Sequence, residues 1–207
     1  MNYSQSNEQE VILNYFSSSD NKIIHNGSFI DIGANDGRTF SNTRALAERG
    51  WRGVLIEPSP KAYAKLKELY SGHKGFYLYN YAIGSHNGKA MLQESGSLCS
   101  DSDVGLVSTF HSHEQDRFKR TVQYEPVEVK IFKWKTFLNR LTIKEFDFIS
   151  MDCEGSELDI LPDMDLTKTK CICLEWNSKP ELKTEYEKYL TGFNLIYTSG
   201  ENLIYAR

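Results

Sequence analysis

Short apolar runs alternate with helical stretches along most of the chain, and this alternation restricts the possible folds more than any other feature of the sequence. Strands are predicted at residues 29–32, 53–57, 76–79, 127–132, 146–151 and 171–176. Helices are predicted at residues 8–18, 41–49, 60–69, 135–141 and 180–190, with another beginning near Ser156. This order is typical of βαβ units built around a parallel sheet.

The C-terminal segment departs from this alternation. Residues 193–198 and 202–206 have the pattern of two strands, and Ser199-Gly200-Glu201 between them is a hairpin signal. A parallel sheet that ends in such a hairpin indicates seven strands, with the last one inserted antiparallel. We therefore predict an α/β, Rossmann-like fold with a seven-stranded, mostly parallel sheet, an antiparallel C-terminal hairpin strand and helices on both faces.

The length of the chain fits one domain. At 207 residues, with 40% hydrophobic and 13% aromatic residues, the sequence can bury a sizeable core. We expect a single domain over residues 1–207, with a helical segment at residues 1–26. Residues 94–125 are polar and rich in glycine and serine, so we expect a long surface insertion that carries substrate contacts.

Charge and composition exclude several classes of protein. A formal net charge of −4 argues against nucleic acid as a partner, because a phosphate-binding surface needs a basic excess. No stretch approaches the roughly 18 consecutive apolar residues of a membrane span, and the polar start MNYSQSNEQE lacks the order of a signal peptide. The four cysteines form no CxxC pair, so buried thiols fit better than a metal site or disulfides. We expect a cytoplasmic protein.

A glycine-containing loop, Asp31-Ile-Gly-Ala-Asn-Asp-Gly37, follows the first predicted strand. Gly33 and Gly37 allow the backbone to approach a ligand closely, and Asn35 tolerates a left-handed conformation better than most residues. The loop leads into a helix whose N-terminal amides favour an anionic group such as a cofactor carboxylate. Glu57 ends the second predicted strand, where an acid can accept hydrogen bonds from both ribose hydroxyls of an adenosine cofactor.

Two other interpretations of this loop remain open. The dinucleotide-binding pattern GxGxxG is absent, because residue 35 is asparagine and residue 38 is arginine. This absence weighs against a nicotinamide cofactor. A strand, turn and helix without any ligand is the other alternative, although the position of Glu57 and the C-terminal hairpin favour a cofactor site.

Four segments carry a resemblance to a known family: FIDIGANDG at 29–37, LIEPSP at 55–60, NYAIG at 80–84 and FDFISMDCEGSELDIL at 146–161. They resemble the FkbM family of class I S-adenosylmethionine-dependent methyltransferases. The resemblance implies the class I methyltransferase fold and S-adenosylmethionine as the cofactor. It implies that the methionyl end is held by Asp31, Gly33, Ala34, Asn35 and Gly37. Glu57 would bind the ribose, and the backbone near Ala82 would lie against adenine.

Polar residues follow the fourth predicted strand, at the edge where open α/β sheets bind ligands. Asp152 is expected to face the cofactor, and Asp152 or Glu154 is a candidate base that removes the proton of the methyl acceptor. His111 and His113 are further candidates because imidazole titrates near neutrality, although a histidine in a polar loop is often only solvated. Glu157 is either a functional group of this kind or a cap of the helix that follows.

Three oxygen-bearing side chains are predicted at neighbouring strand ends: Asp152 after the fourth strand, and Glu175 and Asn177 at the end of the fifth. Such a set suits a hard divalent ion such as Mg²⁺ or Mn²⁺, which would orient the acceptor and lower the pKa of its hydroxyl. The arrangement is similar to that of metal-dependent small-molecule and sugar O-methyltransferases. Alternatively, Glu175 and Asn177 are ordinary polar residues at the start of a loop.

The resemblance and the carboxylates predict an S-adenosylmethionine-dependent O-methyltransferase that acts on a sugar hydroxyl of a glycan or on a small polyol-like acceptor. An N-methyltransferase and a metal-free methyltransferase remain alternatives among methyl-transferring enzymes. A non-catalytic nucleotide-binding module and a NAD-dependent oxidoreductase are alternatives from other classes of protein.

Overall fold

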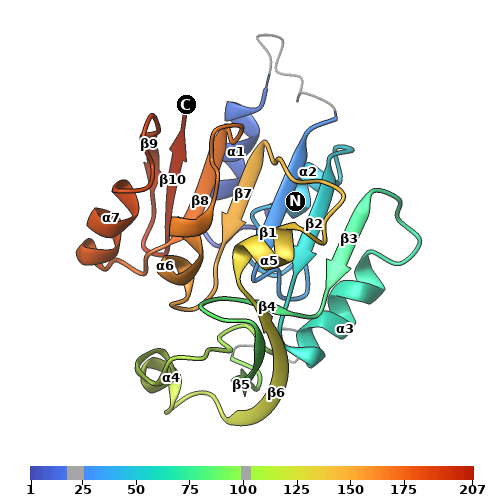
Figure 1. Ribbon diagram of the computed structural model, residues 1–207, viewed down its shortest axis with the longest axis vertical. Helices are drawn as coiled ribbons and strands as arrows, with labels where there is room; N and C mark the ends of the chain where they lie inside the picture. The colour runs from blue at the N-terminus through green and yellow to red at the C-terminus, as the bar shows by residue number, and fades with distance from the viewer. Residues whose placement is uncertain (18–25, 99–103) are drawn as a thin grey trace.

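Residues 1–17, 26–98 and 104–207 are described by a computed structural model, which Figure 1 shows as a ribbon. Seven strands form the main sheet in the order β3-β2-β1-β7-β8-β10-β9. They are β1 Ser28–Ile32, β2 Arg52–Ile56, β3 Phe76–Tyr79, β7 Phe148–Met151, β8 Cys171–Glu175, β9 Asn194–Thr198 and β10 Asn202–Ala206. The five strands from β3 to β8 in this order are parallel, whereas β10 is antiparallel to both β8 and β9. The predicted sheet and its inserted last strand are confirmed.

Alternate residues of a strand point to opposite faces of the sheet. Both faces carry apolar side chains, and helices cover both of them. The face of Phe29 is covered by α1 (Glu8–Tyr15), α2 (Arg44–Ala47) and α3 (Pro60–Leu69). The face of Ile30 is covered by α5 (Trp134–Leu138), α6 (Glu157–Ile160), the short 3-10 helix η1 (Leu161–Asp163) and α7 (Pro180–Glu187). The central strands β1 and β8 are consequently buried along their whole length.

A second, three-stranded sheet lies below the main sheet in the view of Figure 1. Its strands are β4 (Ala82–Ile83), β5 (Gly88–Ser95) and β6 (Tyr124–Phe132), in the order β4-β6-β5. Residues 84–87 connect β4 to β5. The two strands are not paired with each other, however, because β6 lies between them, parallel to β4 and antiparallel to β5.

The helix predicted at residues 41–49 is shorter in the structure, where α2 spans only Arg44–Ala47. Side chains before it hold the backbone in turns. The Asp36 carboxylate accepts hydrogen bonds from the N–H groups two and three residues later, at 2.8 and 2.7 Å, and Ser41 Oγ does the same at 3.3 and 3.1 Å. Such bonds compete with helical ones and delay the helix. Helix α2 has four residues and does not directly follow the glycine loop, so its N-terminal amides lie further along the chain than the sequence predicted.

The remaining expectations concern the N-terminus and the cysteines. Helix α1 ends at Tyr15, and the part of the predicted helical segment at residues 18–25 lies outside the described residues. Among the helices that the structure describes, none is long and apolar enough to cross a membrane. Cys153, Cys171 and Cys173 are free thiols, and Cys99 lies outside the described residues.

Candidate functional site

A cleft of about 810 Å³, partly open to solvent, lies at the carboxyl ends of β1, β2 and β7. Open α/β sheets bind their ligands at this edge. Of the predicted site residues, those that line the cleft are Asp31, Gly33, Ala34, Asn35, Glu57, Ala82, Asp152 and Glu154. Those that are described by the structure but do not line it are Gly37, His111, His113, Glu175 and Asn177.

The loop after β1 is held against the neighbouring strands by its backbone. The N–H groups of Gly33 and the next residue both donate to the carbonyl oxygen of Ile56, at 2.9 and 3.0 Å. Asn35 has a φ of +46°, the left-handed conformation that its residue type predicts. At Gly33, where φ is +90°, an ideal Cβ would lie 1.7 Å from the carbonyl oxygen of Asp152. Glycine is therefore required here by the contact between the ends of β1 and β7, and not only by room for a ligand.

Glu57 follows β2 directly, and only 4% of the residue is exposed. One carboxylate oxygen accepts a hydrogen bond from the N–H of Asn35 and the other from the N–H of Ser59, both at 2.7 Å. Burial raises the pKa of Glu57 to about 8, and the carboxylates of Asp31 and Glu94 add to the rise. The carboxyl therefore holds a proton more readily than an ordinary glutamate, and a ligand that supplies further hydrogen-bond donors favours the ionised form.

Asp31 lies on β1 and faces the same cleft. It is in register with Ser150 on β7, which is in register with Cys173 on β8, so these three side chains form a row on one face of the sheet. Thr43 Oγ1 donates to Asp31 Oδ2 at 2.6 Å. Burial raises the pKa of Asp31 to about 6.

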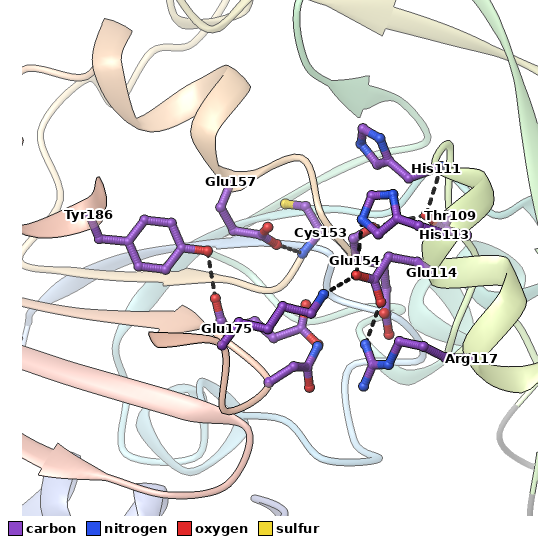
Figure 2. Close-up of polar contacts among 12 residues, drawn as sticks. Thr109, His111, His113, Glu114, Arg117, Cys153, Glu154, Glu157, Glu175 and Tyr186 are labelled. Atoms are coloured by element: carbon purple, nitrogen blue, oxygen red, sulfur yellow. Dashed lines mark hydrogen bonds and ion pairs between the residues drawn. The ribbon is translucent and has the colours of Figure 1, made fainter. Parts of the chain in front are cut away.

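Three carboxylates converge beyond the ends of β7 and β8. One oxygen each from Asp152, Glu154 and Glu175 lies within 4.8 Å of the other two, and Figure 2 shows part of this region. Burial raises the pKa of all three groups well above the ordinary range, and the repulsion between neighbouring carboxylates adds to the rise. Asn177 donates a hydrogen bond to the carboxylate of Glu175. The structure thus brings two of the proposed metal ligands together and adds Glu154 to them.

The loops that carry these carboxylates contain strained backbone. Glu154 and Asn177 both have a φ of +50°, and Ser178 has a φ of +55°. A left-handed conformation of a residue other than glycine costs about 1–3 kcal/mol and is concentrated at functional sites. The strain therefore supports a functional role for both loops.

Helix α4 (Ser112–Phe118) brings a further buried acid to this region (Figure 2). Glu114 is 1% exposed, and its carboxylate is paired with Arg117, Lys179 and, at 3.2 Å, Nε2 of His113. Burial favours a high pKa of Glu114, but hydrogen bonds from Lys179 and Arg117 outweigh it and lower the pKa. These ion pairs fix the segment between β5 and β6 to the loop after β8.

The two candidate histidines lie beside the cleft. His111 Nε2 is 3.1 Å from Ser156 Oγ, and His111 precedes the first residue of α4. The side chain of His113 is 65% exposed and faces Glu114. Gly37 packs against α3 and does not line the cleft. An ideal Cβ at this residue would lie 2.6 Å from Cδ1 of Leu66 on α3.

Glu157 begins α6, and its carboxylate accepts a hydrogen bond from the N–H of Cys153 at 2.6 Å. Burial raises the pKa of Glu157 to about 7. The contact closes the loop after β7 onto the first turn of the helix. Glu157 also lies in the first turn of α6, where an acidic side chain is favourable.

Two further segments line the cleft, and the second belongs to residues 94–125, where substrate contacts were expected. One is the loop before α2, which contributes Thr39, Phe40, Ser41 and Asn42. The other is the end of the segment before α4, which contributes Gly105, Leu106, Ser108 and Phe110. This second part was expected on the surface, but Thr109 is 1% exposed and its Oγ1 donates to the carbonyl oxygen of Glu154 at 2.9 Å. The polar composition of the segment gives no indication of this contact, whose partners are 45 residues apart in the chain.

Comparison with known proteins assigns the family. The sequence matches the methyltransferase FkbM domain over residues 31–195, a range that includes the cleft residues from β1 to the loop after β7. The chain belongs to the FkbM methyltransferase family. A curated relative of this FkbM chain, the 2-O-methyltransferase NoeI of Sinorhizobium fredii (strain NBRC 101917 / NGR234), is 25% identical over 157 residues. The alignment covers 72% of this chain and 63% of the relative, less than two thirds of the relative's length.

Solved structures support the fold of this FkbM family member. The crystal structure of methyltransferase FkbM from Methylobacillus flagellatus KT aligns with a TM-score of 0.55 at 12% identity, over 88% of this chain and 44% of that one. Precorrin 8w decarboxylase from Methanobacterium thermoautotrophicum aligns with a TM-score of 0.53 at 14% identity, over 100% of this chain and 92% of that one. At these identities the similarity shows a shared Rossmann-like fold.

Proposed function

We propose that the protein is an S-adenosylmethionine-dependent O-methyltransferase that acts on a sugar hydroxyl of a glycan or on a small polyol-like acceptor. The observation that carries the proposal is the cleft at the carboxyl ends of the strands, where buried Glu57 lies beside the glycine loop of an FkbM family member. The name of the relative, a 2-O-methyltransferase, supports an oxygen acceptor. We also propose that residues 1–207 act as a single domain, since both sheets contribute to the cleft.

In this proposal the cofactor lies along the cleft. Asp31 and the loop that begins at Gly33 hold its methionyl end. Glu57 accepts hydrogen bonds from the two ribose hydroxyls, which are stronger than neutral ones because the acceptor is charged. Ala82, which is 3% exposed and lines the cleft from β4, presents its backbone to adenine. The transferable methyl group would then face the side of the cleft that contains Asp152.

Methyl transfer requires an acceptor oxygen in line with the sulfonium and a group that takes its proton. Asp152 and Glu154 line the cleft and are the first candidates for this base. Their raised pKa values make them stronger bases than ordinary carboxylates when they are ionised. His111 and His113 are candidates that would act from the edge of the cleft, beside α4.

The carboxylates also fit a divalent cation. Asp152, Glu154 and Glu175 offer oxygens close enough to share one ion, and Mg²⁺ and Mn²⁺ prefer oxygen ligands. Asn177 is already close to Glu175 and could present its amide oxygen after a change of orientation. A bound cation would orient the acceptor and lower the pKa of its hydroxyl. It would also relieve the repulsion that raises the pKa of the three carboxyl groups.

Calorimetric titration tests the cofactor, and labelled S-adenosylmethionine tests the acceptor. We expect S-adenosylhomocysteine to bind and NAD not to bind, because the chain lacks GxGxxG. Among sugars, glycosides, polyols and amines, we expect the methyl label to appear on a hydroxyl. Binding of NAD alone would contradict a methyltransferase, and transfer to amines alone would contradict an oxygen acceptor.

Binding of S-adenosylhomocysteine is expected to strengthen as the pH rises from about 6 to 8. The pKa of Glu57 is about 8 in the free protein, and ribose hydroxyls that donate to its carboxylate favour the ionised form, so that binding releases a proton. Glu57→Gln is expected to remove this dependence and to weaken binding by about 1.5–3 kcal/mol. The measurement is calorimetry at several pH values in buffers of different ionisation enthalpy.

Glu68→Gln is the matched control for this substitution, because it removes a carboxylate from an exposed position on α3. We expect it to change neither the affinity nor its pH dependence. Affinity of the wild-type protein that does not vary with pH, or an unchanged affinity of a folded Glu57→Gln variant, would remove Glu57 from the ribose site.

A further inference from the structure

Asn42 has a polar atom without a partner beside the cleft. The residue lies in the loop before α2, is 7% exposed and lines the cleft. Its Nδ2 is 3.5 Å from Sγ of Cys173, whereas its Oδ1 has no hydrogen-bond partner within the described part of the chain. Buried polar atoms are nearly always paired in folded proteins. Within the described residues, Oδ1 is therefore available to accept a hydrogen bond from a bound ligand.

The surroundings of Asn42 identify the chemistry of that donor. Asn42 and Thr43 contact the two ends of the row formed by Asp31, Ser150 and Cys173, since Asn42 touches Cys173 and Thr43 donates to Asp31. Asp31 and Asn42 both line the cleft. A carboxylate and an amide oxygen are both hydrogen-bond acceptors. They suit a ligand group with several N–H donors and a positive charge.

We propose that Asn42 Oδ1 accepts a hydrogen bond from the α-amino group of S-adenosylmethionine, and that Asn42 and Asp31 together hold this ammonium group. The proposal rests on the proposed function, and it adds a binding residue from the loop before α2. The free end of the amide would gain its missing partner when the cofactor binds. The ammonium group would in turn offset the charge of Asp31, which is buried in the same cleft.

The experiment is a cycle that changes both the protein and the ligand. Wild-type protein and Asn42→Ala are titrated with S-adenosylhomocysteine and with its desamino analogue, in which hydrogen replaces the α-amino group. We expect Asn42→Ala to weaken binding of S-adenosylhomocysteine about tenfold, because a hydrogen bond to a charged group is lost. We expect it to change binding of the desamino analogue less than about twofold, because that ligand has no ammonium group to lose.

Two further variants make the result interpretable. Asn139→Ala removes an exposed asparagine at the end of α5 and is expected to bind both ligands as the wild type does. Asn42→Ser is used if Asn42→Ala fails to fold, since serine keeps a small polar group near Cys173 but cannot span the same distance. It is expected to show the same difference between the two ligands.

Three results would overturn the proposal. The first is an unchanged affinity of Asn42→Ala or Asn42→Ser for S-adenosylhomocysteine. The second is an equal loss for both ligands, which would indicate a structural role of the loop. The third is a loss that disappears with the decarboxylated analogue instead, which would assign the amide to the cofactor carboxylate. Wild-type protein that binds none of these ligands would instead contradict the proposed function.

Discussion

Replacing Gly33 with alanine is expected to destabilise the protein by more than about 4 kcal/mol, which is exceptional for a single substitution. The ideal Cβ of residue 33 would lie 1.7 Å from the carbonyl oxygen of Asp152. Because that oxygen belongs to the backbone at the end of β7, the clash can be relieved only by separating the ends of β1 and β7. The expected result is a large loss of unfolding free energy in urea, together with loss of cofactor binding.

Gly50→Ala is the matched control for the backbone conformation. Gly50 has a φ of +86°, close to the +90° of Gly33, but no atom lies within 4 Å of its ideal Cβ. In Gly50→Ala the only unfavourable contribution is therefore the left-handed conformation of alanine, which should lower the free energy of unfolding by about 1–2 kcal/mol. Similar losses of stability in the two variants would show that the contact with Asp152 does not determine the effect.

Removal of divalent cations is expected to abolish methyl transfer, and Mg²⁺ or Mn²⁺ is expected to restore it. The reason is the convergence of Asp152, Glu154 and Glu175, whose oxygens lie within 4.8 Å of one another. Asp152→Asn is expected to weaken Mn²⁺ binding about a hundredfold. Loss of a residue that only supports a metal ligand already lowers metal affinity by about 10–100-fold, and loss of a charged ligand itself should lower it at least as much. It should lower methyl transfer far more than affinity for S-adenosylhomocysteine. Calorimetry with Mn²⁺ gives a result even before the acceptor is known.

Asp159→Asn is the control for this substitution, because it removes a carboxylate from an exposed position on α6, close to Asp152 in sequence. We expect it to leave Mn²⁺ binding unchanged. Full methyl transfer by metal-stripped protein in chelator would end the metal proposal. The base would then be Asp152, Glu154 or one of the two histidines.

The fold was predictable because its signals are local. Helix α3 begins and ends at the predicted residues, since Pro60 fits the first turn and Ser59 Oγ accepts a hydrogen bond from the N–H of Ala62 at 3.1 Å. The glycine loop and Glu57 were found in the same way, from residue types at the ends of strands. The sequence explained only part of the requirement for glycine at residue 33. The backbone that excludes a side chain there belongs to Asp152, which is distant in sequence.

The rest of the site depends on contacts between residues far apart in the chain. Thr109 bonds to the backbone of Glu154 and Glu114 pairs with Lys179, over separations of 45 and 65 residues. No local pattern in a polar segment indicates such partners. The start of α2 was also misplaced, since side-chain bonds of Asp36 and Ser41 replaced the first helical turn. That error hid the position of Asn42 in the cleft.

A crystal structure of the protein with S-adenosylhomocysteine tests most directly whether this cleft binds S-adenosylmethionine. We expect the ribose hydroxyls to lie within hydrogen-bond distance of the Glu57 carboxylate, with adenine against the backbone of Ala82 and the sulfur on the side of Asp152. A ligand bound away from Glu57, or an empty cleft in crystals grown at a saturating ligand concentration, would contradict the assignment of this cleft to S-adenosylmethionine.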